Sequence, residues 1–391
     1  MKILHIIPYF YPAVSYGGPV NVSYYLTKEL RQLNNEVKVL TTDAYDLNKR
    51  VRLKKNFINN VEVTYLRNLS NKLAKKYNMY LPLGMVKYFR KNIKDNHIIH
   101  IHEYFTVLTV LAVYYACKNK KKIFLQSHGS IVMNTQRGRP LIKNIFNFFF
   151  ENFLLKNVDH FLVLSDEEME YLLKKDVLKN KIHFINNGVD ISEFDNYKFI
   201  DITGRFIKRE VEKEHFKLVF LGRINFIKGF DYLIESVSIL IKRGFNVLLF
   251  IAGDDDGYKI KLEQMINNFK IKENVYFIGF LNKDEKLSLL EQSDIYIQTS
   301  ISDAFPVSVV EAICKFKPVV ITNTIGIARL VDNKFGIVTE LDPNKIADAV
   351  IELLSDKKLR SKFINNAKQM REQLFSWKSI AQELNGLYAT G

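Results

Sequence analysis

The sequence has few cysteines and no long hydrophobic run. Its only cysteines are Cys117 and Cys314, which cannot build a disulfide framework and have no Cys or His at zinc-ligand spacing. The longest apolar run, residues 104–117, has 14 residues, whereas a membrane-spanning helix needs about 20. Residues 1–10 are apolar but lack the small-residue cleavage site of a signal peptide. We therefore expect an intracellular protein with no metal site formed by its cysteines.

Acidic residues are scarce in one segment. Residues 63–150 hold 15 Lys and Arg but only two acids, Asp95 and Glu103. Of the net charge of +15, the first 150 residues therefore carry +17, and the other 241 residues carry −2. A coding bias toward lysine acts on the whole chain and does not explain a local lack of acids. The charge indicates attraction to phosphates, in nucleic acid, anionic lipid or an anionic substrate.

Two basic stretches also contain many apolar residues, namely 72–94 and 137–156. Apolar residues flanked by Lys and Arg are typical of a helix that lies on a membrane surface. For the second stretch, a helix packed in the core is an equal alternative. No nucleic-acid-binding motif accompanies the charge, so we do not expect nucleic acid as a partner. We expect residues 67–156 to meet an anionic membrane, which would place the protein peripherally on the cytoplasmic face of the cell membrane.

Short apolar strands alternate with helical patterns in two successive series. This pattern predicts an α/β fold of two doubly wound, Rossmann-like domains that face each other across a cleft, with ligands at the carboxyl ends of the strands. The polar segment 195–216 is the best linker candidate. The predicted strands are 3–7, 37–41, 98–102, 123–127, 161–164 and 182–185 in the first half, and 217–221, 247–252, 275–278, 295–298 and 319–322 in the second.

Two turns after predicted strands could bind phosphate. Gly17 and Gly18 precede the predicted helix 20–33, where backbone N–H groups can approach a phosphate or sugar, although a tight turn alone would also need glycine. In the second half, Arg223 and Lys228 follow the strand 217–221 and can hold a diphosphate. The alternative for this pair is two solvated loop cations.

A second loop of the second half carries an acidic pair eight residues apart, Asp303 and Glu311. Pro306 marks the first helical turn, so N–H groups around Val307 to Val309 would be free for an anion. Glu311, one turn into the helix, suits ribose hydroxyls, although a surface glutamate is the plain alternative.

Other polar residues at strand ends have two interpretations. His102 and His128 are either site residues or structural histidines. The run Asp254–Asp256 resembles a metal-binding cluster and fits a loop equally well.

Taken in order, these segments resemble the retaining glycosyltransferases of family 4, also called group 1, which have the two-domain GT-B fold. The matching segments are GGPV, HIHE, SHGS, NNGVD, FLGRINFIKG, IAGD, YFIGF, SDIYIQTSISDAFPVSVVEA, KPVVIT and FSWKSIAQELNGLY. The resemblance implies an acceptor-side domain over residues 1–195, joined by a C-terminal helix at about 376–391, and a donor domain over 196–375. Asp303 departs from the family, which usually has Glu at this position.

The resemblance also implies roles for individual residues. Arg223 and Lys228 would bind the donor diphosphate and Glu311 the ribose, while Gly18 contacts the diphosphate from the other domain. His128 would lie beside the transferring sugar, and Asp303 would touch its hydroxyls. Residues 278–280, including Phe280, would lie by the base.

The implied reaction is transfer of a hexose-type unit, with retention, from a UDP- or GDP-sugar to a lipid-linked or polysaccharide precursor. No metal or other cofactor would be required, because cations stabilise the leaving diphosphate. Two alternatives remain: a sugar-nucleotide epimerase of the same fold, and a non-catalytic basic protein that binds nucleic acid.

Overall fold

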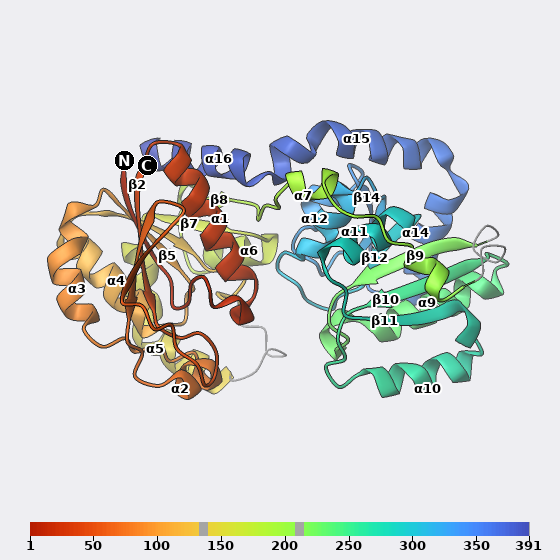
Figure 1. The fold of residues 1–391 in the computed structure, drawn as a ribbon, viewed down its shortest axis with the longest axis horizontal. Helices are drawn as coiled ribbons and strands as arrows, with labels where there is room; N and C mark the ends of the chain where they lie inside the picture. The colour runs from red at the N-terminus through yellow and green to blue at the C-terminus, as the bar shows by residue number, and fades with distance from the viewer. Residues whose placement is uncertain (133–139, 208–214, 391) are drawn as a thin grey trace. The chain divides into compact units, whose positions relative to one another are not determined.

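The computed structural model describes residues 1–132, 140–207 and 215–390, which form two compact units (Figure 1). Unit 1 comprises Met1–Asn187 and Trp377–Gly391, and unit 2 comprises Gly188–Ser376. Each unit has a largely or wholly parallel sheet covered by helices, which confirms the predicted α/β class with two Rossmann-like domains. The first change of unit falls between residues 187 and 188, a few residues before the boundary that we placed at 195.

The sheet of unit 1 has eight strands in the order β3-β4-β2-β1-β5-β6-β7-β8. All neighbours are parallel except the edge pair β3 and β4, which forms an antiparallel hairpin that the sequence analysis missed. The strands are β1 (Lys2–Ile6), β2 (Glu36–Thr42), β3 (Lys55–Ile58), β4 (Val61–Leu66), β5 (Ile98–His102), β6 (Lys122–Gln126), β7 (His160–Val163) and β8 (Ile182–Phe184).

Helices cover both faces of this sheet. Strand β1 directs Leu4 and Ile6 to one core and Ile3 and Ile7 to the other, which explains its continuous apolar run. On the second face α16 lies beside α1 (Figure 1), where Trp377 stacks on Tyr25 with ring centroids 5.5 Å apart. The helices are α1 (Gly18–Gln32), α2 (Asn71–Tyr77), α3 (Met85–Asn92), α4 (Val107–Lys118), α5 (Pro140–Asn157), α6 (Asp166–Leu173) and α16 (Trp377–Thr390).

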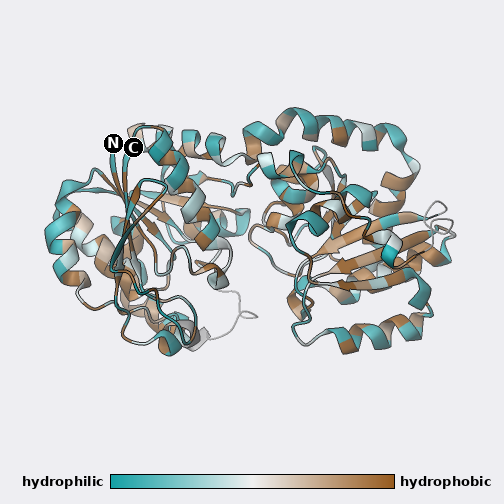
Figure 2. Ribbon diagram, viewed as in Figure 1, coloured by the Kyte–Doolittle hydropathy of each residue, from teal (hydrophilic) through white to brown (hydrophobic). Residues whose placement is uncertain are grey.

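The sheet of unit 2 has six parallel strands in the order β11-β10-β9-β12-β13-β14. They are β9 (Phe216–Leu221), β10 (Val247–Ala252), β11 (Val275–Gly279), β12 (Ile295–Gln298), β13 (Val319–Thr322) and β14 (Gly336–Thr339). Figure 2 shows these strands as mainly hydrophobic, as expected for a sheet buried on both faces. The helices are α7 (Ser192–Asp195), α9 (Phe230–Lys242), α10 (Lys259–Phe269), α11 (Lys283–Gln292), α12 (Val307–Cys314), α13 (Ala328–Val331), α14 (Pro343–Ser355) and α15 (Lys357–Phe375).

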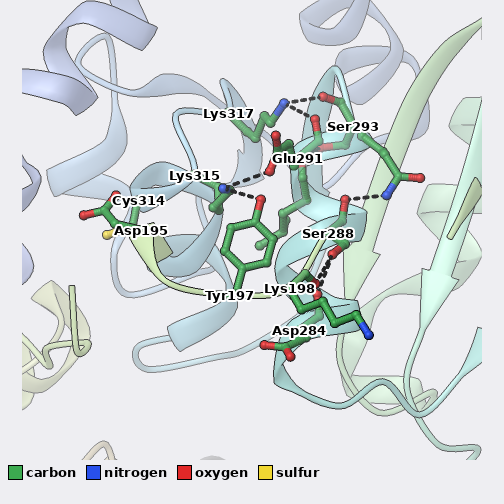
Figure 3. Close-up of polar contacts among 12 residues, drawn as sticks. Asp195, Tyr197, Lys198, Asp284, Ser288, Glu291, Ser293, Cys314, Lys315 and Lys317 are labelled. Atoms are coloured by element: carbon green, nitrogen blue, oxygen red, sulfur yellow. Dashed lines mark hydrogen bonds and ion pairs between the residues drawn. The ribbon is translucent and has the colours of Figure 1, made fainter. Parts of the chain in front are cut away.

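The described part of the segment that we interpreted as a linker is held within unit 2 (Figure 3). Lys315 Nζ donates to Tyr197 Oη at 2.9 Å and lies 4.3 Å from the centre of its ring. Further along, Gln292 on α11 accepts the backbone N–H groups of residues 202 and 203, both at 3.0 Å. Lys317 donates to the carbonyl oxygens of residues 291 and 293, and burial lowers its pKa to about 8. The described residues of this segment are therefore packed against α11 within unit 2.

Helix α5 has two different apolar faces. Phe146, Phe150 and Phe153 pack against the core of unit 1, whereas Phe148 and Phe149 are 84% and 67% exposed. The core interpretation is therefore confirmed for Phe146, Phe150 and Phe153, and the membrane interpretation stays a prediction for the exposed Phe148 and Phe149. Within residues 1–132, 140–207 and 215–390, no helix combines the length and the apolar character needed to cross a membrane.

Candidate active site

The strand order of unit 2 reverses between β9 and β12. The chain runs outward from β9 to β10 and β11, and then returns to add β12 on the other side of β9. In doubly wound sheets, ligands bind outside the carboxyl ends of the strands at such a reversal. The loops that leave these two strands carry Lys228 and Asp303, so this position is the candidate donor site.

A close backbone contact fixes the two loops against each other. Gly229 has φ +65°, and a Cβ on it would lie 1.9 Å from the carbonyl oxygen of Thr299. Only glycine allows this approach. The Thr299 hydroxyl donates to the carbonyl of Gly229 at 3.0 Å, and Ile301 N donates to the carbonyl of Ile227 at 2.8 Å. The Lys228 backbone is therefore held beside the loop after β12.

Lys228 and Asp303 form an ion pair between these loops. Their side chains are only 19% and 14% exposed, so neither charge is fully solvated. Arg223 is placed differently: its side chain is 73% exposed and lies 3.4 Å from a carboxylate oxygen of Asp256. The two predicted diphosphate ligands therefore follow the same strand, but only Lys228 is held in a fixed, largely buried position.

Glu311 has a partner that the sequence analysis did not identify. Lys286, in the first half of α11, donates to Glu311 Oε1 at 2.5 Å, and the Glu311 side chain is 15% exposed. A capping box between Asn282 and Glu285 fixes the start of α11 and thereby the position of Lys286. Glu311 is not the plain surface glutamate that was its alternative interpretation.

The start of α12 differs slightly from the prediction. Pro306 is the N-cap residue, and the helix begins at Val307. Val309 N donates to the Pro306 carbonyl at 3.1 Å, so the expectation that its N–H group is free is wrong. Phe280 follows β11 and is 72% exposed, which leaves its ring accessible to a planar ligand.

One residue of the acidic run after β10, Asp255, binds the backbone that leads into α10. Asp255 Oδ1 accepts the N–H groups of Gly257, Tyr258 and Lys259 at 2.9–3.1 Å, which places it at the start of α10. These backbone hydrogen bonds lower the pKa of the Asp255 carboxyl. The arrangement favours the loop interpretation over a metal cluster.

Unit 1 has a corresponding reversal between β1 and β5. Gly17 is the N-cap residue of α1 with φ +82°, and the helix begins at Gly18 rather than at residue 20. A Cβ on either glycine would meet no atom within 4 Å, so packing does not require glycine at these positions. The positive φ of Gly17 and its N–H bond to the Val14 carbonyl at 3.0 Å fit the tight-turn interpretation, and the ligand interpretation stays a prediction for Gly18.

Two residues that closely follow strands of unit 1 adopt the left-handed conformation, Glu103 after β5 with φ +73° and His128 after β6 with φ +52°. Such strain at non-glycine residues is concentrated at functional sites. Tyr9 Oη donates to Glu103 Oε1 at 2.6 Å, and burial raises the pKa of this carboxyl. His128 Nε2 is hydrogen-bonded to His102 Nδ1 at 2.9 Å. The two histidines that the sequence analysis treated separately are therefore in contact.

Comparison with known proteins assigns the family. Residues 16–193 match the family model "Glycosyltransferase Family 4", and residues 203–370 match "Glycosyl transferases group 1". This chain belongs to the group 1, family 4 glycosyltransferases. Its match to these two models accounts for most of units 1 and 2, and the resemblance inferred from the sequence motifs is confirmed.

Relatives of this glycosyltransferase match along its length. An uncharacterized glycosyltransferase of Methanocaldococcus jannaschii is 26% identical over 99% of this chain and 98% of its own. A phosphatidylinositol N-acetylglucosaminyltransferase chain of Arabidopsis thaliana is 22% identical over 99% of this chain and 81% of its own. The crystal structure of Anabaena HepE in complex with UDP has a TM-score of 0.74 at 17% identity, with full coverage of both chains, and supports the GT-B fold.

Proposed function

We propose that this glycosyltransferase moves a hexose-type sugar, with retention and without a metal ion, from a UDP- or GDP-sugar to a lipid-linked or cell-surface glycan precursor. The observation that carries the proposal is the group of charged side chains at the reversal of the unit 2 sheet, Lys228, Asp303, Lys286 and Glu311. A nucleoside diphosphate needs a cation for its phosphates and an acceptor for its ribose hydroxyls, and this group offers both. HepE, bound to UDP and glucose in a solved structure, and the Arabidopsis transferase support the donor and acceptor classes respectively.

Each site residue has a proposed role. Lys228 and Arg223 bind the diphosphate, and Glu311 accepts hydrogen bonds from the ribose. Asp303, which is paired with Lys228, exchanges this partner for the sugar hydroxyls when the diphosphate binds Lys228. Phe280 and Val307 lie at the ends of the loops that meet the nucleotide. In unit 1, Gly18 presents its backbone N–H group to phosphate, whereas the Gly17 N–H donates to the Val14 carbonyl at 3.0 Å and Gly17 serves the turn before α1. His128 contacts a hydroxyl of the sugar or acceptor.

The reaction then balances without a protein nucleophile. The acceptor hydroxyl oxygen forms a bond to the anomeric carbon on the face from which the diphosphate departs, and the bond between this carbon and the phosphate oxygen breaks. The departing phosphate oxygen takes the proton of the acceptor hydroxyl. Lys228 and Arg223 stabilise the charge that develops on the diphosphate.

The donor is tested first by binding. Purified protein is heated with UDP-, GDP- and other nucleotide sugars in the presence of EDTA, because a ligand that binds the folded state raises Tm. At 100 times Kd the stabilisation is about 2.7 kcal/mol, which gives a shift of several degrees. A nucleotide sugar that shifts Tm is then incubated with lipid-linked acceptors, and NMR of the product reports the anomeric configuration. Inversion, a strict metal requirement, or isomerisation of the donor without an acceptor would each contradict the proposal.

We also propose that unit 1 binds an anionic membrane through α2 and α5. Both helices approach Phe105: Asn78, the C-cap of α2, donates to its carbonyl at 3.1 Å, and Lys143 of α5 lies 5.1 Å from its ring centre. Exposed apolar side chains lie on both helices or next to them, and the surrounding segment 63–150 is strongly basic. These side chains are Leu69, Leu73, Met79, Leu83, Ile142, Ile145, Phe148 and Phe149. Apolar residues for the acyl boundary and cations for the headgroups together fit an anionic lipid surface.

Replacement of both Phe148 and Phe149 by serine should weaken binding to anionic vesicles at least about 100-fold, because burial of each phenylalanine contributes about 1.5–3 kcal/mol. Co-sedimentation with vesicles of phosphatidylglycerol and phosphatidylcholine measures this change. The control is Leu178→Ser, since Leu178 is 64% exposed elsewhere in unit 1. Equal binding of wild-type protein to neutral and anionic vesicles, or no loss in the double variant, would refute the membrane surface.

A further inference from the structure

Four histidines lie together beneath the candidate site of unit 1, and three of them form a continuous hydrogen-bonded series. His5 Nδ1 is 3.0 Å from His102 Nε2, and His102 Nδ1 is 2.9 Å from His128 Nε2. We call His5, His102 and His128 the histidine chain. The fourth, His100, stacks on His102 with centroids 4.3 Å apart and contacts Tyr388 Oη at 2.5 Å.

The sheet dictates this arrangement. His5 on β1 is the direct register partner of His100 on β5, and His102 lies two residues further on the same face of β5. His128 follows β6, the next strand, so its ring reaches His102 across the strand ends. His5, His100 and His102 are at most 1% exposed, whereas His128 is only partly buried. The chain therefore runs from the interior of unit 1 to the edge where ligands bind.

The geometry does not favour a metal ion among these rings, although His5, His100 and His102 have ligand atoms within 4.8 Å of one another. The rings of His100 and His102 are inclined by only 11° and stack face to face. Imidazole lone pairs lie in the ring plane, so those of stacked rings run side by side instead of converging on one point. The hydrogen bonds also occupy both nitrogens of His102.

Proton counting limits the chain to two states. Burial lowers the pKa of His5 and of His128 to about 3 and that of His102 well below its usual value, so all three rings are neutral and carry one N–H each. Each of the two links uses one N–H. His102 has a single proton, which it donates either to His5 Nδ1 or to His128 Nε2. The third N–H of the chain then lies at His5 Nε2 in the first state and at His128 Nδ1 in the second.

Both ends of the chain are buried, but they lie in different parts of unit 1. Neither His5 Nε2 nor His128 Nδ1 is exposed to solvent or has a hydrogen-bond partner among the residues that the structure describes. His5 lies within β1, whereas His128 follows β6 at the edge where ligands bind and is partly exposed as a residue. An N–H group at His5 Nε2 would be an unpaired donor in the core, which is costly and rare. An N–H group at His128 Nδ1 is buried too, but it lies at the edge of the sheet, where an oxygen atom of a bound substrate can accept from it once the covering atoms move. No such partner can reach His5 Nε2 inside the sheet, so the second state is the one we expect.

We infer that His5 and His102 are positioning residues that fix His128 as a neutral hydrogen-bond donor, with its proton on Nδ1, for a hydroxyl oxygen of the sugar or acceptor. This inference deepens the proposed function and rests on its assignment of His128 to the substrate site. In this role His128 holds a hydroxyl and does not remove its proton, which agrees with transfer of the acceptor proton to the departing phosphate. The positive φ of His128 turns its ring back toward His102 and so belongs to the same arrangement.

The first test needs no variant and no substrate. NMR of protein labelled with ¹⁵N in histidine distinguishes a protonated from a bare ring nitrogen by chemical shift, and His128→Gln assigns the signals of His128. We expect a protonated Nδ1 and a bare Nε2 at His128 at pH 7.5. A protonated Nε2, or a doubly protonated ring, would overturn the inference whether or not the transferase activity is ever found.

The second test separates positioning from folding. His102→Leu should lose the fixed tautomer of His128 and lower kcat about tenfold, the size expected for one lost neutral hydrogen bond, with little change in the KM of the donor. His102→Asn can donate to His128 Nε2 through its amide and should recover most of kcat and the wild-type tautomer. The control is His183→Asn, which breaks a His160–His183 hydrogen bond of 3.0 Å outside the chain and should leave kcat unchanged.

A His102→Leu variant that is folded and keeps both the wild-type tautomer and kcat would refute the role of His102. Equal losses in His102→Leu and His102→Asn, with the tautomer of His128 unchanged, would assign the effect to packing alone. If the wild-type protein has no transferase activity, the proposed function is contradicted. The tautomer measurement still decides the inference about His128 in that case.

Discussion

Replacement of Lys228 by alanine should lower kcat/KM for the nucleotide sugar by about 100- to 1000-fold, the usual cost of removing one preorganised group that stabilises developing charge. The close packing of Gly229 against Thr299 fixes the backbone of Lys228, and the ion pair with Asp303 fixes its side chain. The ammonium group is therefore in place before the diphosphate departs. Release of nucleoside diphosphate in a coupled assay measures the change.

By the same reasoning, we expect Arg223 to contribute less to kcat/KM than Lys228. The Arg223 side chain is 73% exposed, and solvent screens and disorders such a group, so Arg223→Ala should lose only about tenfold in kcat/KM. Lys259→Ala is a matched control, because Lys259 lies on the surface of α10, where it pairs with Glu263 at 3.7 Å and lies 5.1 Å from the ring centre of Phe277. It should retain activity within about twofold. A folded Lys228→Ala variant with activity equal to this control would remove Lys228 from the site.

The fold was largely predictable because buried parallel strands leave a strong signal. The predicted strand 98–102 agrees with β5 at both ends, and its neighbours differ by a residue or so. The edge hairpin β3–β4 was missed because β3 is short and half-exposed and begins with Lys55 and Asn56, although β4 is largely buried. The available signal was the pair Asn59-Asn60, whose φ values of +50° and +60° make a two-residue hairpin turn.

The sequence predicted which loops carry the candidate site residues, but it did not predict which of these residues contact one another. Motif order places Lys228, Asp303 and Glu311 after the correct strands, yet their partners depend on how strands are ordered in the sheet. The sequence does not show that β12 returns beside β9, and so it does not pair Lys228 with Asp303. Lys286 was overlooked among many lysines because its importance arises only from the contact with Glu311.

The histidine chain shows the same limit. His5 and His100 interrupt apolar strands, which is a visible anomaly, since a polar residue in a strand buried on both faces needs a partner. The partner becomes evident only from the register of β1 with β5, which joins residues 95 positions apart. Local sequence patterns therefore indicated that these residues were unusual without indicating what they contact.

Acid should destabilise unit 1 strongly through these histidines. Burial lowers the pKa of His5 and His128 to about 3 and those of His100 and His102 well below the usual value. Between an unfolded pKa of about 6.5 and these folded values, the unfolded state binds more protons, so stability is complete above pH 6.5 and falls as the pH decreases. Each histidine contributes about 1.4 kcal/mol per pH unit, and four together about 6 kcal/mol at pH 5.5.

The single tryptophan allows the unfolding of unit 1 to be measured separately from that of unit 2. Trp377 begins α16 and is buried against α1, so its emission in a urea titration reports the unfolding of unit 1. Burial raises the pKa of Glu103 and of Glu168, and these carboxyls act in the opposite sense by stabilising the folded state as the pH falls. The decisive quantity is therefore the difference between two proteins that share these carboxyls.

His100→Gln supplies this difference, because its amide can replace the hydrogen bond to Tyr388 without titrating. Between pH 6.5 and 5, the free energy of unfolding of this variant should fall less steeply than that of the wild type, by about 1.4 kcal/mol per pH unit. Leu178→Ser is the control, since Leu178 is 64% exposed in unit 1 and does not titrate, so this variant should keep the slope of the wild type. Parallel slopes for wild type and His100→Gln would mean that His100 has the same charge in the folded and unfolded states, which contradicts its burial as a neutral ring.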